Sequence, residues 1–189
     1  MESQADLVRE LNSAVANATA LYFRAHAAHW NIIGPGFAEY HELFGEIYED
    51  VFGSIDTWAE NLRKLGAVAP SSLSEIVSTS IIAGGAPLRD ARSLCGDLIE
   101  KNKTVIDTLN DVFECSNAMN QQGIANFAAE RIDMHQKWQW QLTASLGEDV
   151  KDAETDEMVG GIDVSEAHRR SPRSPMTGVK SAYLQRISQ

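Results

Sequence analysis

The chain has 189 residues, of which 43% are hydrophobic, and its formal net charge is −11 at pH 7. This length and apolar content predict one domain with a sizeable core, and the acidic balance argues against general attraction to nucleic-acid phosphates. No apolar run approaches the roughly eighteen residues of a membrane span. The start, MESQADLVRE, also lacks the basic and apolar regions of a secretory signal, so we expect a cytoplasmic protein.

Apolar residues recur at steps of three and four over four long segments, which predicts four long helices. In chain order these helices cover about residues 5–31, 37–65, 87–115 and 120–146. Glycine and proline at residues 33–36 break the first helix from the second, and Gly66 ends the second.

The connection between the second and third helices, residues 67–87, is too long for a simple turn. Ser72 and Glu75 lie three apart in it, a capping pattern that predicts a short extra helix. Cys95 and Cys115 lie about 30 Å apart along the third predicted helix, because twenty residues separate them at about 1.5 Å each. They cannot pair within a subunit, and we expect buried, reduced thiols.

Two histidines and two carboxylates lie on or beside the second predicted helix. His29 and His41 bracket the sequence HWNIIGPGFAEYH, and Asp56 and Glu60 follow, one helical turn apart. These side chains are the ligand types that hold iron or zinc. His41 and Asp56 are about 22 Å apart along a straight helix, too far to share one ion. Two antiparallel copies, related by a two-fold axis near Tyr48, bring them together, which predicts a site between subunits.

With these intervals the chain resembles the Dps family, the miniature ferritins named for DNA protection in starved cells. The family pattern is a histidine before Trp-Asn, a glycine turn, a second histidine, then Asp and Glu, and every interval is kept here. The segments 55–66 and 129–147 are also similar, so the resemblance covers about residues 5–147. It implies an all-α fold: a ferritin-like four-helix bundle with a short helix in the long crossover between the second and third helices.

The resemblance implies that His29 and His41 of one subunit, with Asp56 and Glu60 of its partner, are both the metal ligands and the catalytic residues of a ferroxidase. Such a site binds Fe(II), with zinc as a substitute, and hydrogen peroxide is the expected oxidant, although dioxygen stays open. Two-fold dimers would assemble into a hollow dodecamer that stores ferric mineral and limits oxidative damage to DNA. No Glu is followed three residues later by His, so we expect no di-iron site inside the bundle.

Several neighbouring residues have open roles. His26, one turn before His29, is either an auxiliary ligand or a packing residue, and Trp30 is either a packing residue or a trap for oxidising equivalents. Glu46 and Glu49 are read as surface charges. The start of the fourth helix carries uncharged side chains where many family members have acids that line iron-entry pores. These are Gln121, Gln122 and Asn126.

The resemblance divides the chain into a ferritin-like domain, residues 1–147, and an extension, residues 148–189. Residues 147–166 carry eight acids and one lysine, whereas residues 167–189 carry five Lys and Arg residues and no acid. The simplest interpretation is a flexible tail, but twelve basic tails could bind DNA by multivalency. The alternatives to a ferroxidase are therefore a DNA-compacting protein or a shell-forming structural protein, each acting through this tail.

Overall fold

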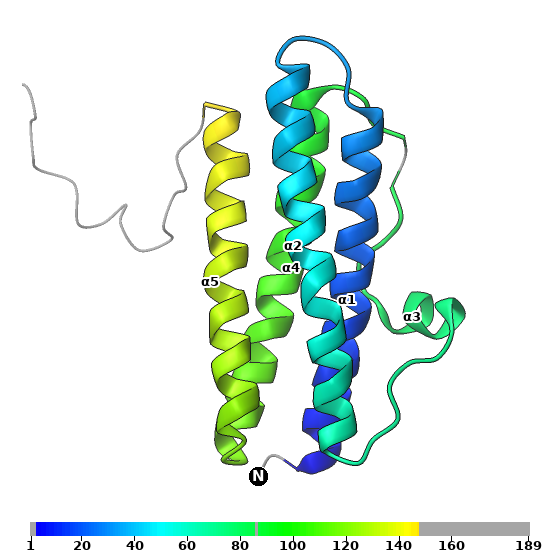
Figure 1. Ribbon diagram of the computed structural model, residues 1–189, viewed down its shortest axis with the longest axis vertical. Coiled ribbons are helices and arrows are strands. Elements are labelled where there is room, and N and C mark those ends of the chain that lie inside the picture. The colour runs from blue at the N-terminus through cyan, green and yellow to red at the C-terminus, as the bar shows by residue number, and fades with distance from the viewer. Residues whose placement is uncertain (1–2, 86, 148–189) are drawn as a thin grey trace, which may run out of the picture. The chain divides into compact units, whose positions relative to one another are not determined.

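The computed structural model describes residues 3–85 and 87–147, and all regular structure within those ranges is helical. Four long helices lie side by side, and a short one sits outside them on the connection between the second and third (Figure 1). In chain order the helices are α1 (Gln4–Asn31), α2 (Phe37–Lys64), α3 (Leu73–Thr79), α4 (Ala91–Ala118) and α5 (Gln122–Ser145). This confirms the predicted all-α four-helix bundle. None of the described helices is both long and apolar enough to cross a membrane.

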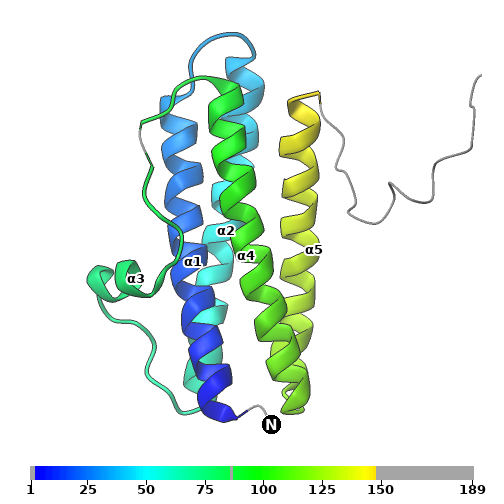
Figure 2. The same cartoon turned by 180° about the vertical axis from the view of Figure 1, so that it is seen from behind.

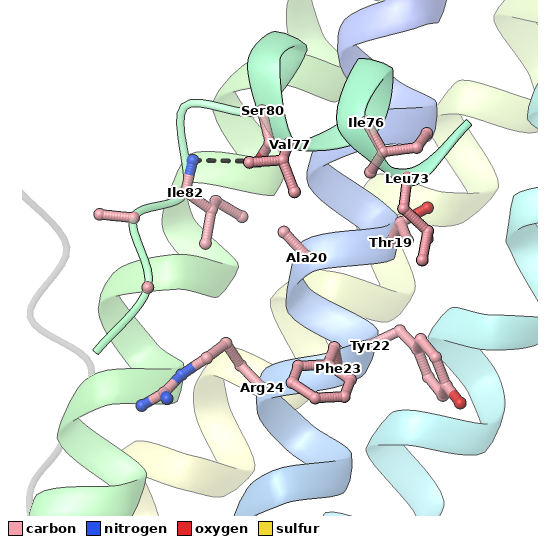
Figure 3. Close-up of a pocket in the computed structure, with 12 residues that line it drawn as sticks. Thr19, Ala20, Tyr22, Phe23, Arg24, Leu73, Ile76, Val77, Ser80 and Ile82 are labelled. Carbon is pink, nitrogen blue, oxygen red and sulfur yellow. Dashed lines mark hydrogen bonds between the residues drawn. The ribbon is translucent and has the colours of Figure 1, made fainter. Parts of the chain in front are cut away.

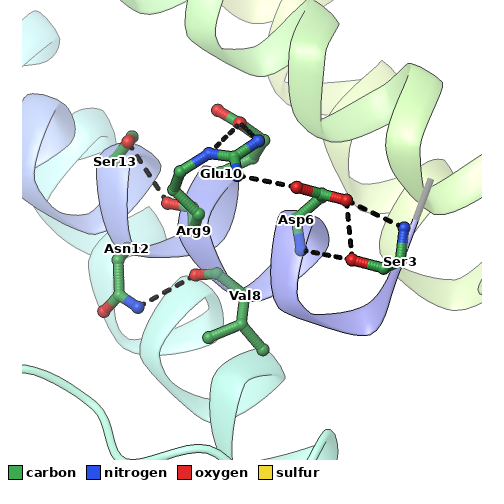
Figure 4. Close-up of polar contacts among 7 residues, drawn as sticks. All are labelled: Ser3, Asp6, Val8, Arg9, Glu10, Asn12 and Ser13. Carbon is green, nitrogen blue, oxygen red and sulfur yellow. Dashed lines mark hydrogen bonds and ion pairs between the residues drawn. The ribbon is translucent and has the colours of Figure 1, made fainter.

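The N-terminus of α1 is fixed by a capping box (Figure 4). The Oγ atom of Ser3 accepts a hydrogen bond from the backbone N–H of Asp6 at 3.3 Å, and the Asp6 carboxylate accepts one from the Ser3 N–H at 3.0 Å. The first turn of a helix leaves N–H groups without intrahelical acceptors, and the cap supplies acceptors for them. The Asp6 N–H also donates to the Ser3 carbonyl oxygen at 3.0 Å. Hydrogen bonds from Ser3 and Arg9 lower the pKa of Asp6 to about 2, so this cap stays ionised at neutral pH.

The long connection runs back along the outside of α1, so α4 starts at the same end of the bundle as α2 (Figure 2). The predicted short helix is present as α3, and the Oγ atom of Ser72 accepts from the backbone N–H of Glu75, as its capping pattern indicated. Buried Asn17 of α1 anchors the chain beyond α3, because its Oδ1 atom accepts from Ser80 Oγ at 2.9 Å and from the Ile81 N–H at 3.0 Å.

The prediction that the third long helix starts near Pro87 was wrong by four residues. Asp90 is the N-cap of α4, and its carboxylate accepts from the backbone N–H of Ser93 at 2.9 Å. A capping aspartate has an extended backbone, which places the residues before it outside the helix. Cys95 and Cys115 are buried as thiols within α4, as predicted, and burial raises the pKa of the Cys95 thiol to about 11.

The apolar stripe of α2 is wider than the bundle core needs. Phe44, Val51 and Trp58 are buried in the core, where α1, α4 and α5 supply the other walls. Other apolar side chains of the same helix stay on its outer edge. These are Phe37 and Phe52, which are exposed, and Tyr48 and Ile55, which are half-buried. One chain thus leaves part of the α2 apolar surface in contact with water.

A polar contact joins α4 to α5 inside the bundle. The Nδ1 atom of His135 donates to Asn102 Oδ1 at 2.7 Å, and Asn102 Nδ2 donates to the His135 carbonyl at 2.8 Å. Burial lowers the pKa of His135 to about 3, with a further contribution from the charge of Arg131 and an opposing one from Asp50. His135 is therefore a neutral structural residue at neutral pH.

Acidification is expected to destabilise the fold through His135. The folded pKa lies below the ordinary value of 6.5, so unfolding takes up a proton between these two values. The contribution of neutral His135 to the free energy of unfolding is fully present above pH 6.5. This free energy falls by about 1.4 kcal/mol per pH unit as the pH decreases from 6.5 toward 3. Urea unfolding of the wild type and His135→Gln at pH 7 and pH 5 measures this, since glutamine can donate to Asn102 but does not titrate. Equal pH dependence in both proteins would contradict the assignment.

Candidate metal centre

The two predicted histidine ligands meet at one end of the bundle. His29 lies in the last turn of α1 and His41 in the second turn of α2, and a tight turn reverses the chain between them. Gly34 and Gly36 adopt φ of 99° and 74° in that turn, a region that favours glycine because it has no Cβ. The two imidazole rings are stacked, with centroids 3.6 Å apart and planes 24° apart.

Each histidine is held by the backbone of the other. The Nδ1 atom of His29 lies 2.7 Å from the His41 carbonyl oxygen, and the Nδ1 atom of His41 lies 2.9 Å from the His29 carbonyl oxygen. A carbonyl oxygen can only accept, so each Nδ1 atom carries a hydrogen, and in the neutral form of each ring Nε2 keeps the lone pair. This is the arrangement of metal-binding histidines, whose second nitrogen is fixed by an acceptor. The histidine pair thus offers two oriented imidazole donors.

Aromatic side chains surround the histidine pair. The His26 ring lies between Trp30 and Tyr48, with centroid distances of 4.1 Å to each, and its centroid is 6.2 Å from that of His29. Phe37 stacks on His41 at 5.1 Å. Trp30 contacts the His26 ring and remains 58% exposed. These contacts give His26 and Trp30 packing roles within one chain. An auxiliary-ligand role for His26 and a role for Trp30 as a trap for oxidising equivalents stay predictions.

The predicted carboxylate ligands lie elsewhere on the same helix. Asp56 and Glu60 are exposed on α2, one turn apart, and the separation of fifteen positions from His41 to Asp56 corresponds to about 22 Å of straight helix. Within the described ranges no three His, Cys, Asp or Glu side chains gather closely enough to hold a metal ion. A single chain therefore brings together the two histidines but not the two acids.

The outer face beside the histidine pair is apolar. Phe23 and Phe52 are exposed by 57% and 59%, and the Phe52 ring packs on Tyr22 with centroids 5.1 Å apart. A pocket of about 490 Å³ continues this face between α1 and α3 (Figure 3). Leu73 and Val77 of α3 line it and are themselves largely exposed. An apolar surface of this extent is typical of a protein–protein contact.

Two features of the centre could not be predicted from the sequence. The carbonyl acceptors of the histidine pair belong to the backbone, which every residue shares. The second feature is the close approach of His29 to Gly45: a Cβ atom built on Gly45 would lie 3.4 Å from His29 Nδ1. A glycine inside a long helix is a sequence signal, because it lowers helix stability by about 1 kcal/mol, but it does not say what lies against it.

Comparison with known proteins identifies the class to which the chain belongs. A family model described as the ferritin-like domain matches residues 8–151. The chain belongs to the ferritin-like family.

Solved structures narrow the assignment to the Dps proteins. The Dps protein of Vibrio cholerae, described as a member of a broad superfamily of ferritin-like diiron-carboxylate proteins, matches with a TM-score of 0.72 and 29% identity, over 76% of this chain and 90% of that one. Dps from Staphylococcus aureus matches with a TM-score of 0.74 and 25% identity, over 77% and 98%. The DNA protection during starvation protein of Brevibacillus brevis is 35% identical over 94 residues, 48% of this chain and 63% of that protein. Within the ferritin-like family, this chain is a member of the Dps family.

Proposed function

We propose that this protein is an iron-storing ferroxidase whose centres form between two subunits. The observation that carries the proposal is the histidine pair. Two backbone carbonyls accept from its Nδ1 atoms, which leaves both Nε2 atoms to donate a lone pair to a metal ion. His29 and His41 of one subunit would bind Fe(II) with Asp56 and Glu60 of its partner. Two imidazoles and two carboxylates suit Fe(II), and leave coordination positions for an oxidant. Zinc fits the same donors and would compete.

This sharing requires a two-fold axis near Tyr48. It would set α2 antiparallel to α2 of the partner, so that Asp56 of the partner subunit comes beside His41, and the symmetry would form the same centre twice. The exposed Phe23, Phe52 and Val77 would be covered in such a dimer, which gives the apolar outer face a role. Neither histidine pair nor carboxylate pair is a complete centre alone.

In the proposed reaction, two Fe(II) ions give one electron each to one hydrogen peroxide molecule. The O–O bond breaks, two protons are taken up and two waters leave, so that no hydroxyl radical is released. The ferric product would collect in the interior of a twelve-subunit shell, and the acidic chain would favour the entry of cations. Gln121, Gln122 and Asn126 would weaken cation attraction at any entrance that they line. Removing both reactants would protect cellular DNA.

The test is Fe(II) oxidation followed by absorbance, with anaerobic hydrogen peroxide or with air. We expect fast oxidation by peroxide, slower oxidation by air, and inhibition by Zn(II) at about one equivalent per centre. His29→Ala should reduce the rate by at least about tenfold, as loss of one ligand weakens binding by more than about 1.4 kcal/mol. A wild-type rate equal to that of buffer would overturn the ferroxidase proposal.

DNA binding and a structural role in a shell are the two alternatives to a ferroxidase, and both would act through the extension. The basic residues 167–189 lie outside the described residues, so both interpretations stay predictions. A mobility-shift assay at low salt, with and without residues 167–189, tests DNA binding. A tail-dependent shift would add DNA binding to the proposed function, and the absence of any shift would remove it.

A further inference from the structure

The proposed dimer fixes which side chains face each other along the two α2 helices. In an antiparallel pair, each step forward on one helix is matched by a step back on the other. If His41 lies beside Asp56 of the partner subunit, then the residue four after His41 faces the residue four before Asp56. These two residues are Gly45 and Phe52. The smallest side chain of the helix is thus set against one of its largest.

Both residues suit such a contact. Phe52 is 59% exposed, although its ring packs on Tyr22 on one side, so most of the ring has no cover within its own chain. Gly45 leaves the surface of α2 without a side chain beside the His29 ring, since a Cβ there would already reach 3.4 Å from Nδ1 and 3.5 Å from Cε1. A larger side chain at position 45 would occupy the space beside His29 that an aromatic ring of the partner subunit could fill.

We infer that the Phe52 ring of each subunit packs over Gly45 of the other subunit and against its His29. The inference rests on the proposed function, because the pairing of His41 with Asp56 sets the register. The two contacts would lie on either side of the two-fold axis, between the two metal centres. Each ring would hold the helices in the one register that aligns histidines with carboxylates, and would shield the flank of His29 from water. Phe52 and Gly45 are therefore positioning residues for the centre.

Cysteine crosslinking tests the register directly. In Gly45→Cys/Phe52→Cys, the two cysteines of one chain lie about 10 Å apart along α2, too far for a disulfide, whereas the inferred contact brings each beside its counterpart in the partner. Mild oxidation should convert most of the protein to a covalent dimer on a non-reducing gel. Gly45→Cys/Arg63→Cys is the matched control, because Arg63 is eleven residues, or about 16 Å, out of register, and it should stay monomeric on the gel.

Side-chain volume gives an independent readout. Gly45→Val should raise the concentration at which the assembly dissociates by at least about tenfold, and Phe52→Ala should do so as well. The double variant Gly45→Val/Phe52→Ala should assemble better than Gly45→Val, because the added methyl groups take the space of the lost ring. Gly96→Val, in open space on α4, controls for valine in a helix and should assemble as the wild type does.

The outcomes separate this inference from the proposed function. Dimers in the Phe52→Cys double variant and not in the Arg63→Cys control support the register, whether or not the wild type oxidises iron. Equal crosslinking of both variants, or of neither in a protein that assembles normally, overturns it. So does a Gly45→Val variant that assembles as tightly as Gly96→Val. An active ferroxidase with either of these results would keep the proposed function and lose only the Phe52 contact.

Discussion

Mixing two inactive variants, His41→Ala and Asp56→Ala, is expected to restore Fe(II) oxidation. Each variant alone damages both centres of its dimer, so each should lose nearly all peroxide-driven activity. A mixed dimer has one centre with both defects and one with neither, because His41 and Asp56 of a centre would come from different chains. Random reassembly makes half of the dimers mixed, so about a quarter of the wild-type activity should return.

The control for this experiment is a mixture of His41→Ala with His29→Ala. Both histidines of a centre would come from one chain, so no combination of these subunits contains an intact centre. This mixture should remain inactive under the dissociation and reassembly conditions that rescue the first. Absorbance of the ferric product measures both mixtures. Recovery in the second mixture, or none in the first despite verified subunit exchange, would refute the sharing of centres between chains.

The fold could be predicted from the sequence because helical periodicity reports burial. The helices were assigned to within a few residues, and the error at the start of α4 came from Pro87 and Leu88, which read as a helix start although Asp90 caps it. Capping is a local hydrogen bond, and proline, serine and aspartate can all stand near a helix start. The side of α2 that faces the core was harder to predict from the sequence. Tyr48 and Ile55 fit the apolar pattern of the helix, but they belong to an apolar surface that the core does not cover.

The centre could be predicted only in part. The residue types and intervals indicated His29, His41, Asp56 and Glu60, and the structure brings the first two together. The length of α2 indicated that the two acids lie too far from His41 to share a metal ion with it in one chain. That distance led to the prediction of a site shared between two subunits. The carbonyl contacts and the packing of His26 depend on how two helices cross, and no pattern in the sequence encodes that.

An ion pair between α2 and α5 is the second feature with a large expected effect. Asp50 accepts from Arg131 Nη1 at 2.9 Å and Nη2 at 2.6 Å, and from Trp138 Nε1 at 2.8 Å. Only 7% of the Arg131 side chain is exposed, against 22% of the Asp50 side chain. Burial alone would raise the pKa of Asp50, but the bonds from Arg131 and Trp138 outweigh it, and the pKa falls below its ordinary 3.8. The carboxylate is therefore ionised at neutral pH.

Asp50→Asn is expected to lower the free energy of unfolding at pH 7 by about 3–5 kcal/mol, because it leaves the Arg131 charge buried without a counter-charge. Removing the other partner of the pair, in Arg131→Met, should lower the free energy of unfolding by less, since the remaining Asp50 carboxylate is closer to water. Asp50→Leu/Arg131→Met removes both charges and should recover most of the loss. Glu46→Gln, on the exposed side of the same helix, controls for the loss of one carboxylate and should change stability by less than about 0.5 kcal/mol.

Urea unfolding followed by circular dichroism compares the four variants with the wild type. The lowered pKa of Asp50 gives the sign of the pH effect: its contribution is present above the unfolded pKa, 3.8, and is lost as the pH falls through the folded value. The difference between the wild type and Asp50→Leu/Arg131→Met should therefore be nearly constant from pH 7 to pH 5, because burial, the largest cause of the lowered His135 pKa, is present in both proteins and the charges of Arg131 and Asp50 act on it in opposite directions. If Arg131→Met proved as costly as Asp50→Asn, the pair would act through its hydrogen-bond geometry rather than through the buried charge of Arg131.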